Sequence, residues 1–502
     1  MRDVAFRVGD GEHAALVGAN GTGKTTLLRL LAGDLQPTAG SARVDGRMLA
    51  MRQLHPTGEE RVVDHLLTLA PVAIRRAAAV VSAAERAGSA TDADGVRLAD
   101  AYQRFGDAGG WDLEVEWDVC AVAALGRGFD EIRDRRLSTL SGGEQKRLAL
   151  EYLLRSDADV LLLDEPDNFL DVPAKEWLET SLQTSSKTIL LVSHDRELLA
   201  RAANRIVTIE GQGAWTHGGS FATYHAAREA RIDRIDEEHR RHQERRKQLE
   251  ASVVELRRRS IVSDAFASRL RATKTKIEQL DRQAPPERPR EQSITMRLGG
   301  DRTGKRAVVV EGLELAGLTD PFSTEIFFGE RVGIIGHNGT GKSHFLRLLA
   351  GEPIEHAGDW RLGARVVAGY FSQVHEHPEL AGRSLLELLL ATGHARGEAM
   401  AALRRYELHD AWNQTFDTLS GGQQARVQVL LLETSGATLL LLDEPTDNLD
   451  VASAEALEDA VAQFQGTVVI VTHDRWLMRA CDRFLIFGRD CSVTEALEPR
   501  YR

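Results

Sequence analysis

The chain has 502 residues, 42% of them hydrophobic and 27% charged, a balance typical of globular proteins of more than one domain and one that excludes general disorder. Its net charge of -12 argues against nucleic-acid binding over the whole surface, and its three cysteines form no CxxC pair, which predicts a reduced, intracellular protein. No apolar run reaches the ~18 residues that cross a bilayer, and the first residues form no secretory segment, so we expect neither membrane insertion nor export.

A glycine loop, Gly18 to Thr25, follows a short apolar segment, His13 to Val17, and precedes a Leu-rich stretch. A Gly-x4-Gly-Lys-Thr loop between a strand and a helix turns its backbone N–H groups toward a polyphosphate. Lys24 would reach the β and γ phosphates, and the hydroxyl of Thr25 would ligate Mg²⁺. This pattern predicts binding of ATP or GTP.

Four further segments of the first half carry candidate site residues. Ser141 precedes Gly142 and Gly143 and can cap a helix whose bare N-terminus a phosphate could approach. The apolar run Val160 to Leu163 ends at Asp164, a candidate magnesium ligand, and at Glu165, a candidate for polarising the attacking water. The next apolar run, Thr188 to Val192, leads to His194, which we expect to contact the γ phosphate. Between these segments, the Ala-rich residues from Val63 to Gly110 predict helices, either a spacer or an interaction arm.

The middle of the chain predicts a helical hairpin. Residues 222 to 283 contain neither Gly nor Pro, which favours long helices, and we expect a turn near Ser260 to Asp264. Apolar residues recur at helical spacing on both arms and would form the seam between them: Leu249, Val253 and Leu256, then Phe266, Leu270, Ile277 and Leu280. Residues 226 to 290 hold 18 Lys and Arg against 12 Asp and Glu, so the charge is strongly segregated.

The second half repeats the motifs of the first half in the same order. The glycine loop returns from Gly336 to Ser343 after the run Arg331 to Ile335, and the Ser-Gly-Gly motif returns from Ser420. The run Leu439 to Leu442 ends at Asp443 and Glu444, and the run Thr467 to Val471 leads to His473. Continuous apolar runs are typical of buried parallel strands, so two homologous α/β domains are predicted.

The two loops and their neighbours form the predicted nucleotide site. The catalytic candidates are Glu165, Glu444, His194 and His473, and the magnesium ligands Thr25, Asp164, Ser343 and Asp443. The residues expected to bind nucleotide are Gly18, Ala19, Asn20, Gly21, Thr22, Gly23, Lys24, Thr25 and Thr26, with Gly336, His337, Asn338, Gly339, Thr340, Gly341, Lys342, Ser343 and His344.

The Leu-Ser-Gly-Gly-Glu/Gln motifs that begin at Leu140 and Leu419 resemble the signature sequence of ATP-binding cassette proteins. The resemblance implies that each signature loop serves the nucleotide of the opposite cassette. Lys24 and Glu165 would then share ATP with Ser420, Gly421 and Gly422, and Lys342 and Glu444 would share ATP with Ser141, Gly142 and Gly143. Gln53 and Gln373 resemble the family's Q-loop glutamines, and Asp171 and Asp450 its D-loop aspartates.

Two cassettes in one chain, joined by a basic helical linker, resemble the ABC-F family of ribosome-associated ATPases. Gly218 to Tyr224, which leads into the linker, and Phe266 to Lys276 in its second helix carry this resemblance. It implies a cytoplasmic, monomeric chain whose cassettes pair with each other around ATP and Mg²⁺. It also implies binding at the ribosomal exit site, as a translation factor or in antibiotic resistance by target protection.

The resemblance also sets the expected domains: a first cassette at 1–218 with an arm at about 63–110, a linker at 219–300, a second cassette at 301–490 and a tail at 491–502. A basic segment at 245–276, with ten Lys and Arg against three acids, predicts phosphate contacts with ribosomal RNA.

The chain departs from the family in three places. Seventeen residues precede Gly18, so we expect the first cassette to lack the opening strand and its adenine-stacking aromatic. In the second cassette no Tyr occupies the expected adenine-stacking region, where Phe322 is the candidate, and Phe169 occupies a D-loop position that is commonly polar.

Two other classes remain open from the sequence. A duplicated ATPase subunit of a membrane transporter would leave the linker unexplained. A DNA-repair or chromosome-organising ATPase usually has long coiled coils or zinc modules, which this sequence lacks.

Overall fold

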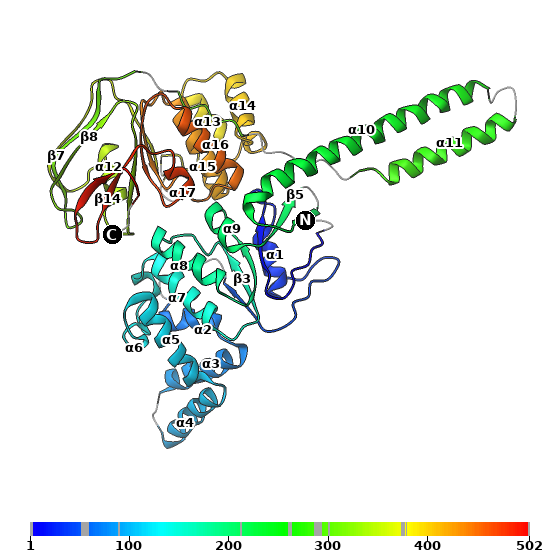
Figure 1. Ribbon diagram of the computed structural model, residues 1–502. Helices are drawn as coiled ribbons and strands as arrows, with labels where there is room; N and C mark the ends of the chain where they lie inside the picture. Colours follow the sequence, from blue (N-terminus) through cyan, green and yellow to red (C-terminus); the bar gives the residue numbers. More distant parts are fainter. Residues whose placement is uncertain are drawn as a thin grey trace.

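The computed structural model describes residues 4–51, 60–88, 91–210, 213–259, 264–285, 294–299, 302–372, 377 and 379–499. Two α/β cassettes lie against each other, and a helical hairpin projects from them (Figure 1). The predicted fold class is confirmed. The predicted Q-loop residues Gln53 and Gln373 lie outside the described residues.

Each cassette is built on a six-stranded sheet, and the two sheets have the same strand order. The first runs β2-β3-β4-β1-β5-β6 and the second β11-β12-β13-β9-β14-β15, with only the last strand of each antiparallel to its neighbour. The strands of the first sheet are β1 His13–Val17, β2 Met48–Met51, β3 Val160–Asp164, β4 Thr188–Val192, β5 Arg205–Glu210 and β6 Gly213–His217. Those of the second are β9 Arg331–Gly336, β11 Ala368–Phe371, β12 Leu439–Asp443, β13 Thr467–Val471, β14 Arg483–Phe487 and β15 Val493–Ala496.

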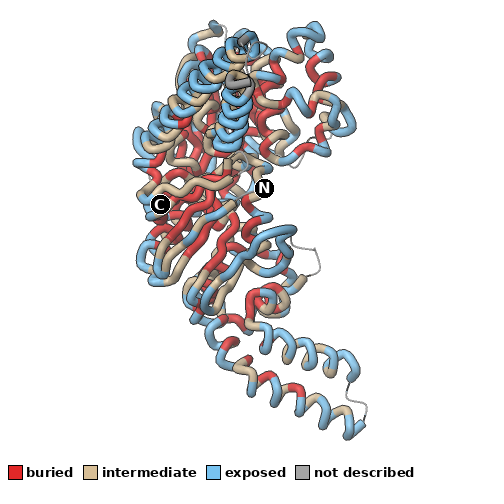
Figure 2. The backbone as a smooth tube through the Cα atoms, turned by 90° about the vertical axis from the view of Figure 1, so that its right-hand side faces the viewer, coloured by how far each residue is buried: buried red, intermediate tan, exposed pale blue. Residues whose placement is uncertain are grey.

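The central strands are those that the apolar runs predicted. β1, β12 and β13 are buried along their whole length, because helices cover both faces of a parallel sheet. Figure 2 shows the buried segments of the chain, in red, concentrated in the body of the molecule. A parallel sheet brings the carboxyl ends of β1, β3 and β4 to one edge, where the glycine loop, Glu165 and His194 follow them.

Helices flank the sheets at corresponding places in the two cassettes. In the first cassette they are α1 Lys24–Leu31, α7 Gly142–Arg155, α8 Val172–Gln183 and α9 Arg196–Ala202. In the second they are α12 Lys342–Leu349, α15 Gly421–Thr434, α16 Val451–Gln463 and α17 Arg475–Met478. Short 3-10 turns lie at Leu137–Thr139, His409–Ala411 and Phe416–Thr418.

Between β2 and α7 the first cassette has a larger helical region than the second has between β11 and α15. It contains α2 Val62–Leu69, α3 Val72–Ala87, α4 Asp92–Asp107, α5 Gly110–Leu125 and α6 Phe129–Ile132, against α13 Leu385–Ala391 and α14 Arg396–Arg405 in the second. The helices therefore continue past residue 110, the expected end of the arm. Helices α3 and α4 pack together and project from the cassette (Figure 1).

A three-stranded antiparallel sheet accompanies the second cassette. Its strands are β7 Arg306–Leu315, β8 Phe322–Phe327 and β10 His356–Leu362. Residues 4–51 of the first half contain no equivalent sheet. Phe322 belongs to the core, because its ring packs 5.6 Å from that of Phe345 and 6.0 Å from that of Phe487, centroid to centroid. Its expected availability for stacking on adenine is therefore wrong.

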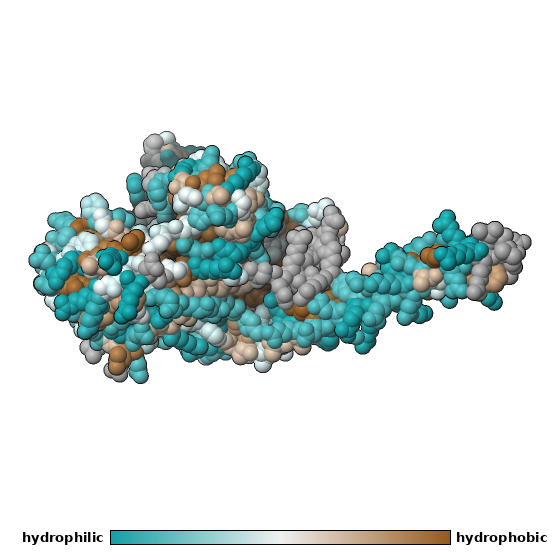
Figure 3. All heavy atoms as spheres, turned by 90° about the horizontal axis from the view of Figure 1, so that it is seen from above, coloured by the Kyte–Doolittle hydropathy of each residue, from teal (hydrophilic) through white to brown (hydrophobic). Residues whose placement is uncertain are grey.

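The linker is an antiparallel pair of helices, α10 Phe221–Arg259 and α11 Asp264–Arg282. The seven predicted seam residues are all partly buried, and the imidazole Nε2 of His242 lies 3.0 Å from the carbonyl oxygen of Leu280. The predicted turn at 260–263 lies outside the described residues. Figure 3 shows the hairpin as a mostly hydrophilic projection.

The second cassette extends beyond its expected boundaries at both ends. Met296, placed in the linker by the sequence, packs into the second cassette's core. Strand β15, placed in the tail, pairs with β14 through Val493 and Phe487. None of the helices described is long and apolar enough to cross a membrane.

Candidate functional site

The two glycine loops place a lysine at the start of α1 and of α12. Burial lowers the pKa of Lys24 and of Lys342. Each ammonium donates to two carbonyls of its own loop: Lys24 to Gly18 at 2.7 Å and Ala19 at 3.1 Å, Lys342 to Gly336 at 2.9 Å and His337 at 2.8 Å. Thr22 and Thr340 close the loops by donating to Ala19 and His337. Both loops therefore form the same compact turn with a cation held inside it.

Hydroxyl and carboxylate groups meet at the first turn of each of these helices. Ser343 Oγ donates to Asp443 Oδ1 at 3.1 Å, and a hydrogen bond from Thr25 opposes the burial that raises the pKa of Asp164. Burial raises the pKa of Asp443 as well. One carboxylate oxygen of Asp164 is buried without a hydrogen-bond partner. A hydroxyl beside a carboxylate with a free oxygen suits a hard divalent cation.

Glu165 and Glu444 share an unusual backbone conformation at equivalent positions. Their φ angles are 48° and 45°, in the left-handed region that non-glycine residues rarely adopt. Each backbone N–H donates at 2.9 Å to the end of the neighbouring strand, to Val192 and to Val471. Strained backbone of this kind persists where the surroundings impose it, often at functional sites.

Both glutamates have a raised pKa. Burial and the charge of Asp164 raise the pKa of Glu165, and burial followed by Asp447 raises that of Glu444 to about 8. A carboxylate with a pKa near neutrality accepts a proton more readily than an exposed one.

The two histidines lie beside these glutamates in unequal settings. His473 donates its backbone N–H to Glu444 at 2.9 Å, and its Nε2 lies 3.2 Å from Asn338 Oδ1. Both ring nitrogens of His194 are buried without a hydrogen-bond partner. Burial lowers the pKa of His194 to about 3 and that of His473 well below its usual range, so both rings are neutral at pH 7.

The signature loops begin α7 and α15 with equivalent caps. Ser141 accepts from the backbone N–H of Glu144, and Ser420 from that of Gln423, while the longer side chains reach back to the serines. The glycines that follow meet the opposite cassette. A Cβ at Gly422 would collide with the side chain of Asn20, and one at Gly143 would lie 3.4 Å from the side-chain nitrogen of Asn338 as well as 2.7 Å from the carbonyl oxygen of Phe169 in its own cassette. The loops come close to each other because these positions carry no side chain.

Further hydrogen bonds join each glycine loop to the opposite D-loop. Asn20 Nδ2 donates to the carbonyl of Asn448 at 2.9 Å, and Asn338 Nδ2 donates to that of Phe169 at 2.9 Å. The backbone N–H of Asn20 donates to Asp450, whereas Asp171 pairs at 2.7 Å with the imidazole of His337.

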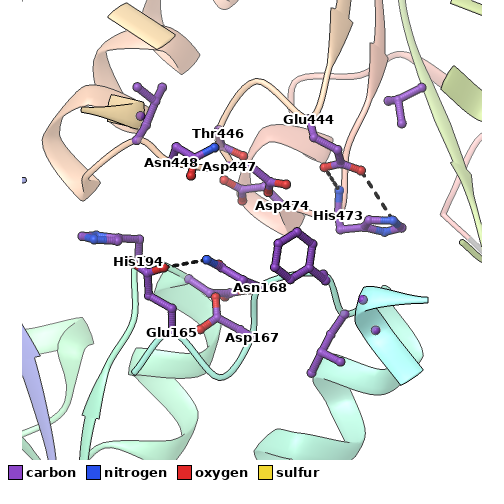
Figure 4. A pocket seen from close by; sticks show the side chains of 18 of the residues that line it. Glu165, Asp167, Asn168, His194, Glu444, Thr446, Asp447, Asn448, His473 and Asp474 are labelled. Atoms are coloured by element: carbon purple, nitrogen blue, oxygen red, sulfur yellow. Dashed lines mark hydrogen bonds and ion pairs between the residues drawn. The ribbon is translucent and has the colours of Figure 1, made fainter. Parts of the chain in front are cut away.

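A cavity of about 600 Å³ runs between the cassettes and is lined by both. Figure 4 shows Glu165, Asp167 and His194 of the first cassette facing Asp447 and Asp474 of the second. The structure thus brings the predicted loops, signature motifs, glutamates and histidines together in two composite sites.

Several charged residues in and around this cavity were not predicted from the sequence. Lys175 of α8 and the D-loop carboxylates Asp167 and Asp447 line the cavity, and Lys146 donates to the carbonyl of Glu165 at 2.6 Å. Aligning the two repeats could have found the lysines, because the equivalent residues of the second cassette are Ala425 and Ala454.

Comparison with known proteins agrees with this geometry. The sequence profile of the ABC transporter family matches residues 1–168 and 319–447. An antibiotic resistance protein of Mycobacteroides abscessus is 50% identical, over 100% of this chain and 96% of that protein. The ABC transporter F family member 5 of Arabidopsis thaliana is 30% identical, over 95% of this chain and 71% of that protein.

Among solved structures, an archaeal ribosome recycling factor crystallised with a ribosomal stalk protein shares the fold. It aligns with a TM-score of 0.55 at 20% identity, over 96% of this chain and 84% of that chain. Three observations indicate the same family. The chain has two nucleotide-binding cassettes, its signature motifs face the opposite glycine loops, and relatives match it over nearly its whole length. The chain belongs to the ABC-F family of ATP-binding cassette proteins and is an ATPase.

Proposed function

We propose that this ATPase binds the ribosome from the cytoplasm and closes around two MgATP molecules to protect the ribosome from an antibiotic. The observation that carries the proposal is the basic hairpin on an otherwise acidic chain. Residues 226–290 have a net charge of +6 and the whole chain -12. Charge segregated in this way favours a polyanionic partner for the hairpin.

The hairpin presents its basic residues to solvent. The nine whose side chains are described between 245 and 276 are all exposed: Arg245, Arg246, Lys247, Arg257, Arg258, Arg269, Arg271, Lys274 and Lys276. The side chain of Arg259 is not among those described. Phe266 is the one aromatic residue of this segment. Phosphate contacts should therefore dominate over base stacking in binding ribosomal RNA.

Each composite site would hold one ATP between a glycine loop and the opposite signature loop. Lys24 with Ser420, Gly421 and Gly422 would bind one nucleotide, and Lys342 with Ser141, Gly142 and Gly143 the other. The lysines are already inside the loops, and the helix N-termini at the signature motifs favour anions.

The residues present fit Mg²⁺. Thr25 and Asp164, and Ser343 and Asp443, would hold one ion in each site, directly or through water. The ion supplies positive charge beside the β and γ phosphates.

Hydrolysis would depend on Glu165 and Glu444. Their raised pKa suits them to polarise the attacking water, and the neutral rings of His194 and His473 can donate a hydrogen bond to the γ phosphate. Nucleotide bound between the cassettes would hold these groups of opposite cassettes together.

The test uses a protein that closes but does not hydrolyse. The E165Q/E444Q variant, with ATP, should co-sediment with ribosomes through a sucrose gradient at low salt and should not do so with ADP. Absence of ATP-dependent sedimentation would contradict ribosome binding and favour an ATPase subunit of a transporter, which should instead co-purify with a permease.

The resistance role has its own test. The name of the Mycobacteroides abscessus relative supports it. Expression of this chain in a sensitive host should raise the inhibitory concentration of at least one ribosome-targeting antibiotic, and expression of E165Q/E444Q should not. If the inhibitory concentration stayed unchanged for all classes of such antibiotics, the resistance role would be wrong, and a role as a translation factor would remain.

A further inference from the structure

One buried lysine breaks the equivalence of the two cassettes. Lys175 lies on α8, four residues after the D-loop aspartate Asp171, whereas Ala454 lies four residues after Asp450. Lys175 is only 9% exposed. A charge buried this deeply needs partners of opposite charge. At the equivalent position the second cassette has an uncharged alanine.

The partners of Lys175 come from both cassettes. Its Nζ lies 3.0 Å from Asp195 Oδ2 of the first cassette and 3.5 Å from the backbone carbonyl oxygen of His473 in the second. Burial disfavours its charge, but the carboxylates of Asp195, Asp167 and Asp447 outweigh burial and raise the pKa of Lys175. The ammonium therefore stays charged where the two cassettes meet.

The charge of Lys175 also acts on Asp447, which lines the same cavity. Burial raises the pKa of Asp447 to about 6, and the acids Asp167, Asp443 and Asp474 act in the same direction. Lys175 opposes them. The second cassette has alanine at the positions equivalent to Lys146 and Lys175. The charge that compensates Asp447 thus comes from the opposite cassette, and separating the cassettes would remove it.

We propose that Lys175 is a positioning residue for ATP hydrolysis in the site built on Lys342: from the opposite cassette it holds the His473 backbone and neutralises Asp447 when the cassettes are closed. This rests on the proposed roles of Glu444 and His473. His473 and Glu444 are joined by a 2.9 Å hydrogen bond, so a displaced His473 backbone would move the glutamate as well. At the site built on Lys24 the equivalent residue is Ala454, which has no side chain to reach His194. The two sites should therefore differ in their dependence on Lys175.

The experiment measures one site at a time. E165Q leaves the Lys342 site competent for hydrolysis, and E444Q leaves the Lys24 site competent. Single-turnover hydrolysis of γ-labelled ATP by the full chain should fall about 10-fold when K175M is added to E165Q. It should fall by a smaller factor when K175M is added to E444Q, because at the Lys24 site Lys175 pairs with Asp195, beside His194, and not with the histidine backbone itself. K175R should restore the rate of the Lys342 site to within about threefold of the parent, because the charge is kept.

Two further variants separate positioning from a structural role. In an E165Q/D447N background K175M should lower the hydrolysis rate by a factor at least about threefold smaller than in E165Q, because the carboxylate that Lys175 compensates is gone. K146M is the matched control. Lys146 is also buried but contacts the Glu165 carbonyl of its own cassette, so its replacement should affect mainly the Lys24 site. If K175M does not fold, as judged by thermal unfolding, K175Q takes its place, since it keeps a hydrogen-bond donor but not the charge.

Equal losses at both sites, no loss at the Lys342 site, or no recovery with K175R would each overturn the proposal. Failure of the proposed function would be detected separately, in variants that retain Lys175. If E165Q/E444Q still turned over ATP, Glu165 and Glu444 would not be the catalytic groups, and the assignment of Lys175 would fall with them.

Discussion

Arg196 of the first cassette and Glu458 of the second form a bidentate ion pair across the interface. Arg196 is 3% exposed, donates to Glu458 from both terminal nitrogens, one at 3.0 Å, and lies over the ring of Trp476. The repeat supplies the reciprocal pair, in which Arg475 donates to Glu179 from both nitrogens, one at 3.2 Å. Each arginine lies two residues after a candidate catalytic histidine, so the pairs connect both histidine loops to the opposite cassette.

Removal of one partner of the Arg196–Glu458 pair should weaken the closed arrangement of the two cassettes. Arg196→Gln leaves the partly buried Glu458 without its cation, and the cost should stay below the about 3–5 kcal/mol of a fully buried pair. We expect lower ATP-dependent proximity of the cassettes, measured by energy transfer between dyes on the two domains. The charge-swapped R196E/E458R variant should recover part of the loss. Arg155→Gln, which breaks a pair within α7, is the control and should leave closure unchanged. Equal closure of wild type and Arg196→Gln would show that the pair is dispensable.

Replacing both candidate catalytic glutamates should separate binding from hydrolysis. E165Q/E444Q should retain ATP, measured by filter binding, because the lysines and signature loops are intact. Turnover should fall by ~10²- to 10⁴-fold, the usual contribution of a general base. Turnover within threefold of wild type would remove both residues from the catalytic step.

The cross-cassette geometry predicts a site-specific effect of Ser420→Arg. Gly422, two residues on, already touches Asn20 of the opposite loop, so a long side chain at the start of α15 should block the Lys24 site. Nucleotide trapped before steady state should disappear from that site and persist at the Lys342 site. Loss at the Lys342 site alone would contradict the head-to-tail arrangement.

The hairpin predicts a salt dependence of ribosome binding. Each Lys or Arg that contacts a phosphate contributes about one unit to the log-log slope of affinity against salt. Arg257→Ala with Arg258→Ala should therefore flatten the slope by about two units and weaken co-sedimentation. ATPase activity without ribosomes should barely change. The matched control is the exposed doublet Arg75 and Arg76 of α3, whose replacement should leave the slope as in wild type.

His65 in the arm predicts an acid-sensitive region. Its ring is buried with Nε2 unpaired, and burial lowers the pKa of His65 from 6.5 to about 4. Above pH 6.5 the residue is neutral whether folded or unfolded. Between pH 6.5 and about 4 only the unfolded state binds the proton, so stability falls as the pH decreases, by roughly 2 kcal/mol at pH 5.

Replacement of that histidine should remove this dependence. His65→Leu should reduce the difference in amide exchange of α2 between pH 7.5 and 5.0, once the intrinsic rates are corrected. The same pH difference in wild type and variant would assign the acid sensitivity to other groups.

Much of the fold and of the two sites could be predicted from the sequence alone. Phosphate binding needs a strand, a glycine loop and a helix in immediate succession, so the whole motif is local in sequence, as it is from His13 to Leu31. Buried parallel strands are continuous apolar runs for an equally local reason, and β1, β4 and β13 have the predicted bounds. The hairpin seam followed from helical spacing.

Only the tertiary structure decided which residues of one cassette meet the other. Asn20 touches Asn448, and Lys175 lies beside the backbone of His473, hundreds of residues away in sequence. No local pattern marks such pairs, because they arise from the packing of two completed domains. The same holds for Phe322, which the sequence predicted to stack on adenine but which is packed against Phe345. Sequence therefore determined the chemistry of each half, and the packing of the halves decided which groups of one complete the site of the other.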